Sequence, residues 1–490
     1  MAVIEIVSLL GYLIPAIRLW TFAAVAILFL ILALRNFRLA VFVLLAELFI
    51  GSKGYLFYLE FGGINLSVRI VFFLIIIAVW SANFLIRVFV ETHSHASLQI
   101  FKEDGFFRSK FFYPYLALLA AVIFGIIRGV LAGNASQNIF FDANGYFYLA
   151  LAPIFYGILK TEEGRRDLFN FLFAAAIWVS AKTLFLLAVA THLQGDFFYQ
   201  IYRWVRTTGI GEITPWSGGF YRVFIQSQIY VVFALLIVLA GKQTLSLFQR
   251  GLTQTLPLSQ RGSWRGIFIG ALFFSAIFVS LSRSFEVGLV AAIVTGLVLL
   301  FVETHNYASL LKFGGRVVVM VVFGFLLAGL ISPGFFGAAS GRAGELGGAA
   351  ANTRLAELPP IWEQIKKNPL WGSGFGATLT FKSSDPRVLQ INPSGDYTTY
   401  AFEWGYLDIF MKLGIVGMGV YLWLIWRIAK NLFKKRGAGG SLPFEKGELE
   451  RDLYLGLFLG LIALLVINIF SPYLNHPLGI GFLMILMAII

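Results

Sequence analysis

The sequence predicts an all-α polytopic membrane protein, and three observations support this fold class. Hydrophobic residues make up 59% of the 490 residues, whereas soluble proteins contain roughly 45–50%. Charged residues make up only 13%, about half of their usual share. Apolar runs that are long enough to cross a bilayer recur along the whole chain. We therefore expect a single integral membrane domain over residues 1–490.

The apolar runs set the expected number of membrane helices at 12–14, because several boundaries are soft and the runs near 285 and 477 are short. The predicted spans are residues 20–34, 38–52, 66–88, 112–132, 143–159, 168–192, 221–241, 266–282, 285–302, 315–333, 403–427, 452–470 and 477–490. Residues 4–17 form either one more short span or an interfacial helix.

Composition also limits the chemistry. The sequence has no cysteine, which excludes disulfides, thiolate nucleophiles and cysteine-ligated metals. The five histidines show no metal-binding spacing such as HExxH, so no metal site is predicted. The net charge of +13 reflects the Lys and Arg residues that membrane proteins carry in cytoplasmic loops, and it does not indicate a nucleic-acid partner.

Lys and Arg residues also predict the orientation, because loops that are rich in them normally face the cytoplasm. The basic loops lie at residues 35–38, 102–110, 160–166, 242–265, 312–316 and 427–451. The 193–220 loop and a long polar insert, residues 333–402, then lie on the opposite side, which is the periplasm or the cell exterior.

The insert at 333–402 contains the most distinctive segment of the chain. An amphipathic helix over 354–367 places Leu358, Trp362 and Ile365 on one face, so it is predicted to lie on the membrane surface or on another helix. An Asn-Pro pair ends this helix. Three alternating glycines follow, which permit positive φ angles or a close backbone approach: Gly372, Gly374 and Gly376.

Arginines lie at outer helix ends and in the insert, against the usual charge bias of membrane proteins. Those at helix ends are Arg69, Arg128, Arg222 and Arg283, and those in the insert include Arg342 and Arg354. One interpretation is that each side chain reaches to lipid phosphates. The other is that they converge on an anion, because the planar guanidinium binds phosphate through two hydrogen bonds and stays charged.

Topology links two of these arginines. The predicted helix 221–241 runs inward from Arg222, and the predicted helix 266–282 returns to the outer face just before Arg283. The two side chains therefore begin and end one helical hairpin. This arrangement predicts a joint clamp for a pyrophosphate at the outer membrane surface.

Glu403 lies where the insert re-enters the membrane. Burial beside Phe402, Trp404 and Tyr406 would raise the pKa of its carboxyl group, and a nearby arginine would lower that pKa. A carboxylate at this place can act as the general base on a sugar hydroxyl. The alternative is that Glu403 is a structural partner for one of the arginines.

Three blocks of this sequence resemble the bacterial O-antigen ligase and O-antigen polymerase superfamily. The blocks are Leu-Ser-Arg-Ser at 281–284, the arginine, Trp-bearing helix and NPLWGSGFG run at 354–376, and EWGYLDIFMKLG at 403–414. Arg222, at the outer start of a predicted helix, is a weaker fourth match. The resemblance covers about 200–430, and the N-terminal half agrees only in hydropathy and in Arg69 and Arg128.

The resemblance implies an all-helical membrane enzyme whose donor is a glycan on undecaprenyl pyrophosphate and which needs no cofactor. It implies that Arg222, Arg283 and Arg354 hold the pyrophosphate, and Arg69 and Arg128 are further candidates. Related ligases use a loop histidine as the proposed base. Glu403 occupies the corresponding position here, which favours a polymerase or an exopolysaccharide relative.

This family chemistry implies a membrane glycosyltransferase that polymerises lipid-linked repeat units, with catalytic roles for Glu403, Arg283 and Arg222. Cations stabilise the leaving pyrophosphate, a base activates the acceptor hydroxyl, and attack opposite the pyrophosphate inverts the anomeric carbon. Several aromatic residues are either stacking platforms for the acceptor glycan or an interfacial belt: Trp362, Trp371, Tyr397, Tyr400 and Trp404.

Other functions stay open at this point. A ligase would move a finished glycan to a lipid or protein acceptor by the same chemistry. A transporter or flippase of lipid-linked sugars would show polar signals near the midplane, whereas here they lie at one face and in one loop. A scaffold would leave the arginines unexplained. The expected location is the bacterial cytoplasmic membrane, with the bilayer and a chain-length regulator as further partners.

Overall fold

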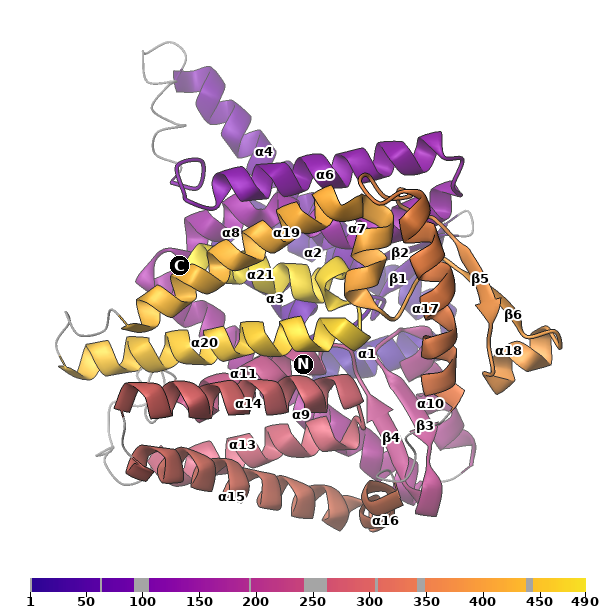
Figure 1. Cartoon of the computed structure of the whole chain (residues 1–490), viewed down its shortest axis with the longest axis vertical. Coiled ribbons are helices and arrows are strands. Elements are labelled where there is room, and N and C mark those ends of the chain that lie inside the picture. Colours follow the sequence, from indigo (N-terminus) through magenta and orange to yellow (C-terminus); the bar gives the residue numbers. More distant parts are fainter. Residues whose placement is uncertain are drawn as a thin grey trace.

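The computed structural model describes residues 2–61, 64–91, 105–193, 195–241, 262–304, 307–341, 349–437 and 444–490. The protein is an all-α polytopic membrane protein, as predicted (Figure 1). Within the described residues, β-structure is limited to three two-stranded antiparallel hairpins. Several of the basic loops that predict the orientation, including 242–261 and 438–443, lie outside the described residues.

Eight helices in the described part of the chain are long and apolar enough to cross a membrane. They are α2 (Pro15–Arg35), α4 (Val68–Glu91), α6 (Phe112–Leu131), α9 (Glu162–His192), α14 (Arg283–Thr304), α15 (Tyr307–Ile331), α19 (Gly405–Gly437) and α20 (Phe444–Phe470). Four shorter apolar helices accompany them: α1 (Ala2–Leu13), α11 (Gln228–Ala240), α13 (Gly262–Val279) and α21 (Pro477–Ile489). In the described residues, eight helices therefore meet the length of a membrane span, fewer than the 12–14 that the sequence predicts, because several of the predicted spans fold as shorter helices.

The remaining elements are shorter and connect these helices. They are α3 (Phe37–Ile50), β1 (Tyr58–Phe61), β2 (Ile64–Ser67), α7 (Ser136–Phe147), η1 (Tyr148–Leu151), α8 (Ala152–Leu159), α10 (Asp196–Thr207), β3 (Glu212–Pro215), η2 (Ser217–Gly219), β4 (Tyr221–Phe224) and η5 (Tyr473–Asn475). The predicted span at 143–159 corresponds to α7, η1 and α8, which follow one another without a gap.

The predicted helix at 221–241 is wrong at its start. Residues 221–224 form strand β4, which pairs antiparallel with β3, and the helix α11 begins only at Gln228. Gly218 and Gly219 have positive φ angles of 68° and 75° and reverse the chain between the two strands. The Tyr-Arg-Val-Phe segment that follows is rich in residues that favour strands, so it pairs with β3, and the helix starts about two turns later than predicted.

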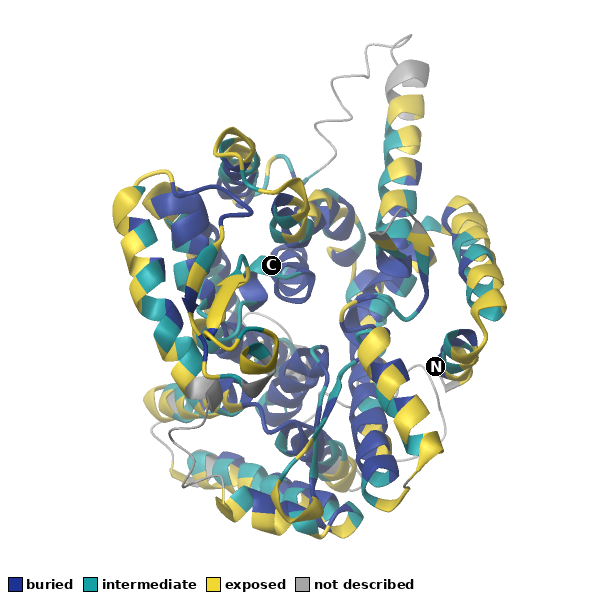
Figure 2. Ribbon diagram, turned by 90° about the vertical axis from the view of Figure 1, so that its right-hand side faces the viewer, coloured by how far each residue is buried: buried dark blue, intermediate teal, exposed yellow. Residues whose placement is uncertain are grey.

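The core of the bundle surrounds α11. Every residue from Gln228 to Leu239 is buried, and α11 packs against α9, α13 and α20. Its sequence contains no charged residue, so burial on all sides costs no desolvation of charge. Exposed apolar side chains lie on outer helices instead, such as Leu74 on α4 and Val290 on α14, as expected for surfaces that face lipid (Figure 2).

The insert covers one end of the bundle. It contains α16 (Gly334–Gly341), α17 (Ala349–Lys367), β5 (Leu379–Lys382), α18 (Pro386–Ile391) and β6 (Asp396–Thr399). In Figure 1, α17 lies across the ends of the membrane helices, and β5, β6 and α18 extend away from the bundle as an arm. The amphipathic helix predicted over 354–367 is confirmed, and it begins five residues earlier.

The buried face of α17 differs slightly from the prediction. Ile361 and Ile365 are buried in a small apolar cluster with Phe402 and Met411, through which α17 packs on the start of α19. Trp362, which the sequence places on the buried face, is 50% exposed. α17 therefore packs on α19 through a face that contains Ile361 in place of the predicted Trp362.

Candidate active site

Arg222 is anchored to the end of α13. Its Nε donates a hydrogen bond to the carbonyl oxygen of Ser280 at 2.7 Å, and its guanidinium carbon lies 5.1 Å from the centre of the Phe224 ring. The β3–β4 hairpin sets this position, because its register places Thr214 opposite Arg222. The strand thus holds the side chain against the turn that leads into α14.

That turn carries Arg283. Leu281 has a φ angle of +43°, which is rare for a bulky residue and costs about 1–3 kcal/mol. The hydroxyl of Ser284 lies 3.1 Å from that of Ser282 and 3.0 Å from that of Ser471, which ties the turn to the end of α20. Arg283 is the first residue of α14 and its side chain is exposed. One turn therefore brings together the two arginines that topology linked.

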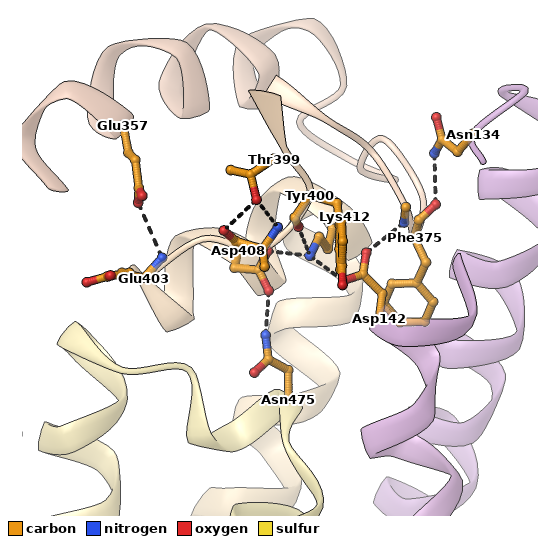
Figure 3. Close-up of polar contacts among 12 residues, drawn as sticks. Asn134, Asp142, Glu357, Phe375, Thr399, Tyr400, Glu403, Asp408, Lys412 and Asn475 are labelled. Atoms are coloured by element: carbon orange, nitrogen blue, oxygen red, sulfur yellow. Dashed lines mark hydrogen bonds and ion pairs between the residues drawn. The ribbon is translucent and has the colours of Figure 1, made fainter. Parts of the chain in front are cut away.

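A second charged cluster lies where the insert returns to the membrane. Arg354 on α17 forms an ion pair through Nε with Oε2 of Glu403. The backbone N–H of Glu403 donates to Oε2 of Glu357 at 3.3 Å, and the indole N–H of Trp404 donates to the Arg354 carbonyl oxygen at 2.8 Å. Glu403 is therefore an ion-pair partner of Arg354, one of its two predicted roles. Figure 3 shows the contact between Glu403 and Glu357.

Glu357 is the carboxyl group in this cluster with the altered acidity. It is buried, and burial raises its pKa to about 7 because the charged form loses hydration. The charges of Glu403 and Asp408 raise the pKa further, whereas the backbone hydrogen bond from Glu403 and the charge of Arg354 lower it. A carboxyl group with a pKa near 7 is suited to proton transfer at neutral pH.

A cavity of about 570 Å³ lies next to these groups, within the size range of small-molecule sites. Its polar lining comes from α4, α7, α19, the link between α20 and α21, and three connecting segments. It includes Arg69, Asn475 and His476, together with Lys53, Gln226 and Tyr400 from the connecting segments. Gln226 follows Arg222 by four residues, and Pro472 follows Ser471, the partner of Ser284. Arg222 and Arg283 do not line the cavity themselves, and its lining reaches only the residues next to their anchoring segments.

A buried ion-pair network forms one wall of this cavity. Lys412 on α19 lies 2.6 Å from Oδ1 of Asp408 and 2.7 Å from Oδ1 of Asp142 on α7. Asn475 donates a side-chain hydrogen bond to Asp408. All three charged side chains are at most 8% exposed. Such a network costs desolvation energy and persists only while its charges stay paired (Figure 3).

The same network holds both ends of the arm. Oδ2 of Asp142 accepts a hydrogen bond from the backbone N–H of Gly376 at 2.6 Å. Nζ of Lys412 donates to the carbonyl oxygen of Tyr400 at 2.8 Å. The chain thus leaves the bundle at residue 376, which is bound to Asp142, and returns at residue 400, which is bound to Lys412. Asp142 and Lys412 are the two members of one ion pair.

His476 faces the cavity at the start of α21. Its Nδ1 accepts a hydrogen bond from the backbone N–H of Leu478 at 3.3 Å. Burial, together with the nearby cations Arg69 and Lys53, lowers its pKa to about 3. His476 is therefore a neutral imidazole in the physiological range, which suits a hydrogen-bond donor better than a base.

Arg69 and Arg128 have different environments. Arg69 lines the cavity, but its Nε lies 2.7 Å from Oε2 of Glu47 and its Nη1 donates to the Ser52 carbonyl oxygen at 2.8 Å. Arg128 lies outside this cavity, where it donates to the carbonyl oxygen of Gly372 and, at 2.8 Å, to Oδ1 of Asn368. Neither side chain contacts the turn that carries Arg283 in the described contacts.

The three glycines of the insert adopt the predicted backbone. Gly372, Gly374 and Gly376 have φ angles of +70°, +78° and +77°. A Cβ at Gly372 would lie 2.3 Å from the Lys412 carbonyl oxygen, and one at Gly374 would lie 2.3 Å from the backbone nitrogen of Gly129. The close approach is therefore to α19 and α6, and these glycines pack the insert into the bundle.

The predicted aromatic residues do not share one surface. Trp362 is half exposed on the outer side of α17. Tyr400 lines the cavity and stacks on Phe141, with 6.3 Å between ring centres. Trp404 packs on Phe470 at 5.8 Å. Of the three, only Tyr400 borders the cavity in the described residues.

Sequence reasoning missed Asp142, Lys412, Asn475 and His476. A signal was present for two of them, because a lysine or aspartate inside an apolar run is a candidate functional residue by default. Asp408 and Lys412 are also four residues apart, so they share one face of α19. Asn475 and His476 carry no such signal, since they follow an ordinary Ser-Pro helix end.

Residues 268–422 match the family model described as O-antigen ligase. The match contains Arg283, Arg354, Glu403 and Lys412, and it confirms the resemblance to the O-antigen ligase and polymerase superfamily over about a third of the chain. Arg222 and the link between α20 and α21 lie outside the matched residues. No curated protein matches the sequence at a significant level.

Proposed function

We propose, on the premise that residues 268–422 form an O-antigen ligase domain, that the protein is a membrane glycosyltransferase that polymerises undecaprenyl-pyrophosphate-linked repeat units into a surface polysaccharide. The observation that carries this proposal is the contact between Arg222 and the turn of Arg283. Arg222 on β4 and Arg283 at the turn that Arg222 contacts are suited to a diphosphate leaving group. The reaction needs no metal and no nucleotide.

In the proposed reaction, the bond between the anomeric carbon of the donor sugar and the pyrophosphate oxygen breaks. A hydroxyl oxygen of the acceptor forms the new glycosidic bond, and its proton passes to a carboxylate. Undecaprenyl pyrophosphate leaves with the bonding electrons. Arg222, Arg283 and Arg354 would stabilise the charge that grows on this group. Attack from the side opposite the pyrophosphate would invert the anomeric carbon.

Two carboxyl groups are candidates for the base. The side chain of Glu403 is 51% exposed, so an acceptor hydroxyl can reach it, and we propose it as the base. Glu357 is buried but has a pKa of about 7. Replacement of the true base by glutamine should reduce the rate by about 10²–10⁴-fold, so Glu403→Gln and Glu357→Gln, assayed side by side, distinguish the two residues.

We further propose that the protein lies in the bacterial cytoplasmic membrane with this site on the periplasmic face. That face is where a lipid-linked repeat unit would be accessible and where a chain-length regulator would act. The cavity next to Tyr400 would hold the donor or acceptor glycan. An oligosaccharide there would contact amide, hydroxyl and aromatic groups, which recognise sugars without requiring charge.

Reconstitution tests this function. The purified protein is placed in liposomes with an undecaprenyl-pyrophosphate-linked repeat unit from its own host and with EDTA, and products are separated on a gel. A ladder of lengths supports the polymerase. Transfer that occurs only after a separate lipid or protein acceptor is added would establish a ligase instead. No product under either condition would contradict the glycosyltransferase.

A further inference from the structure

A groove of about 470 Å³ lies outside the cavity, between the ends of α6 and α17. Its wall on α6 is apolar and includes Phe124, Ile127 and Leu131, which are 40%, 50% and 82% exposed. Trp371 continues this wall, with its ring centre 5.4 Å from that of Phe124. Because α6 is a membrane-spanning helix, this wall faces hydrocarbon.

The opposite wall of the groove is polar. It comes from the C-terminal end of α17 and from the glycine turn, and it includes Gln364, Asn368 and Thr378. The groove is therefore amphipathic, with a lipid-facing side and a side that offers amide and hydroxyl groups. This combination suits a molecule that has a hydrocarbon chain and a polar head.

Arg128 lies between the two walls, and its described hydrogen-bond acceptors are neutral groups. Its Nε and Nη2 donate to the Gly372 carbonyl oxygen and to the Asn368 amide oxygen, and neither acceptor carries a negative charge. In the described residues, Arg128 has no carboxylate partner and its Nη1 has no hydrogen-bond acceptor. By contrast, the buried cations Arg69 and Lys412 are neutralised by carboxylates. A guanidinium held in place but not neutralised is suited to bind an anion.

We propose that this groove is a second lipid-phosphate site, which holds the pyrophosphate of the undecaprenyl-linked acceptor while Arg222 and Arg283 hold that of the donor. This inference rests on the proposed polymerase, which must bind two lipid-linked glycans at once. A diphosphate would bind Nη1 of Arg128 and the side-chain amide groups of Gln364 and Asn368. The polyprenyl chain would follow the apolar wall of α6.

The length of α17 relates this site to the proposed chemistry. Arg354, the partner of Glu403, and Gln364, at the groove, are ten positions apart on one helix. They are therefore about 15 Å apart along its axis. An oligosaccharide attached to a phosphate in the groove can extend along α17 and present its terminal hydroxyl to Glu403.

Thr378 allows a test that leaves the fold intact. It is exposed, it lines the groove, and it makes no hydrogen bond in the described residues. Thr378→Glu places a negative charge beside Arg128 without removing a contact, and Thr378→Gln is the uncharged control of the same size. Like-charge repulsion should weaken phosphate binding in the groove at least about tenfold.

The measurement is native mass spectrometry of the protein with undecaprenyl pyrophosphate as the probe. The wild type and Thr378→Gln should bind two molecules, Thr378→Glu should bind one, Arg283→Ala should bind one, and Thr378→Glu/Arg283→Ala should bind none. Two molecules bound to Thr378→Glu would overturn the second site. Two molecules bound to Arg283→Ala, with one on Thr378→Glu, would leave the groove supported and contradict the donor site of the proposed function.

A competition experiment distinguishes the source of the phosphate. Excess phosphatidylglycerol should not displace the probe from Arg283→Ala, in which only the groove is filled. Displacement by the same excess of phosphatidylglycerol would mean that the groove holds an ordinary membrane phospholipid, and the acceptor assignment would be overturned.

Discussion

Lys412 and Arg128 both contact the glycine turn at 372–376, but only Lys412 is paired with carboxylates. The Lys412 carbonyl oxygen accepts from Gly374, and its ammonium lies within 2.7 Å of two carboxylates. Arg128 holds the Gly372 carbonyl oxygen, and its other described partner is an amide. Both side chains fix the turn, yet only the lysine is neutralised.

This difference separates a structural cation from a binding cation. A carboxylate partner neutralises the charge of a cation. A neutral acceptor holds the cationic side chain in place without neutralising it, so that the cation can still bind an anionic ligand. Position alone does not distinguish the two residues, because both lie near the same end of membrane helices. The identity of their partners distinguishes them. This distinction can be tested by replacing each cation and measuring the loss of stability and of activity.

Lys412→Met should have the largest effect on stability. It leaves Asp142 and Asp408 buried without a cation, which costs about 3–5 kcal/mol. Thermal unfolding in detergent, followed by intrinsic fluorescence, measures this loss. Lys412→Met/Asp408→Asn should recover part of it, because one unpaired carboxylate is removed. An unchanged unfolding temperature for Lys412→Met would show that the network is not structural.

Arg283→Ala should have the largest effect on activity. Loss of one cation at the leaving group should lower the initial rate of polymer formation by about 10²–10³-fold. The unfolding temperature should change little, because the side chain is exposed. Arg283→Lys, which keeps the charge but loses the planar fork, should give an intermediate rate. Full activity in Arg283→Ala would refute the pyrophosphate clamp.

Arg128→Met sharpens the comparison with Lys412. It removes two hydrogen bonds and leaves no buried carboxylate, so the cost should be about 1–3 kcal/mol, less than for Lys412→Met. The same unfolding assay compares the two variants directly. Equal losses would mean that Arg128 is a structural cation after all.

Glu357→Gln should have the smallest effect on stability, and this effect should depend on pH. The pKa of Glu357 is raised from 4.5 to about 7, so its contribution to stability is full below about 4.5 and is lost as the pH rises through about 7. The unfolding temperature of Glu357→Gln should therefore rise relative to the wild type between about pH 5 and about pH 8. Parallel curves for the two proteins would contradict the raised pKa.

Local patterns predicted the insert well. The amphipathic period of residues 354–367 and the Asn-Pro pair that follows mark α17 and its end. The spacing of Gly372, Gly374 and Gly376 marks positive φ angles, because few other residues adopt them. The sequence also placed Arg222 near Arg283, because both chain segments reach the same end of the bundle. The secondary structure predicted for Arg222 was wrong.

Long-range pairing could not be predicted in this way. Asp142 and Lys412 are 270 residues apart, and no period or motif relates them. Asn475 and His476 face the cavity only because the link between α20 and α21 folds back beneath α19. The predicted helix at Arg222 failed for a similar reason, since β4 forms by pairing with β3. Which carboxylates neutralise which cations is likewise a property of the packed bundle.

The attachment of the arm has a consequence for how this protein can vary. The backbone enters the arm at Gly376, bound to Asp142, and leaves it at Tyr400, bound to Lys412. Because both ends are bound to one buried ion pair, the residues between them form an exchangeable segment whose length and sequence can change without moving Glu403. Transplanting this segment between relatives, or inserting a reporter peptide into it, should preserve the fold while altering what the outer surface recognises.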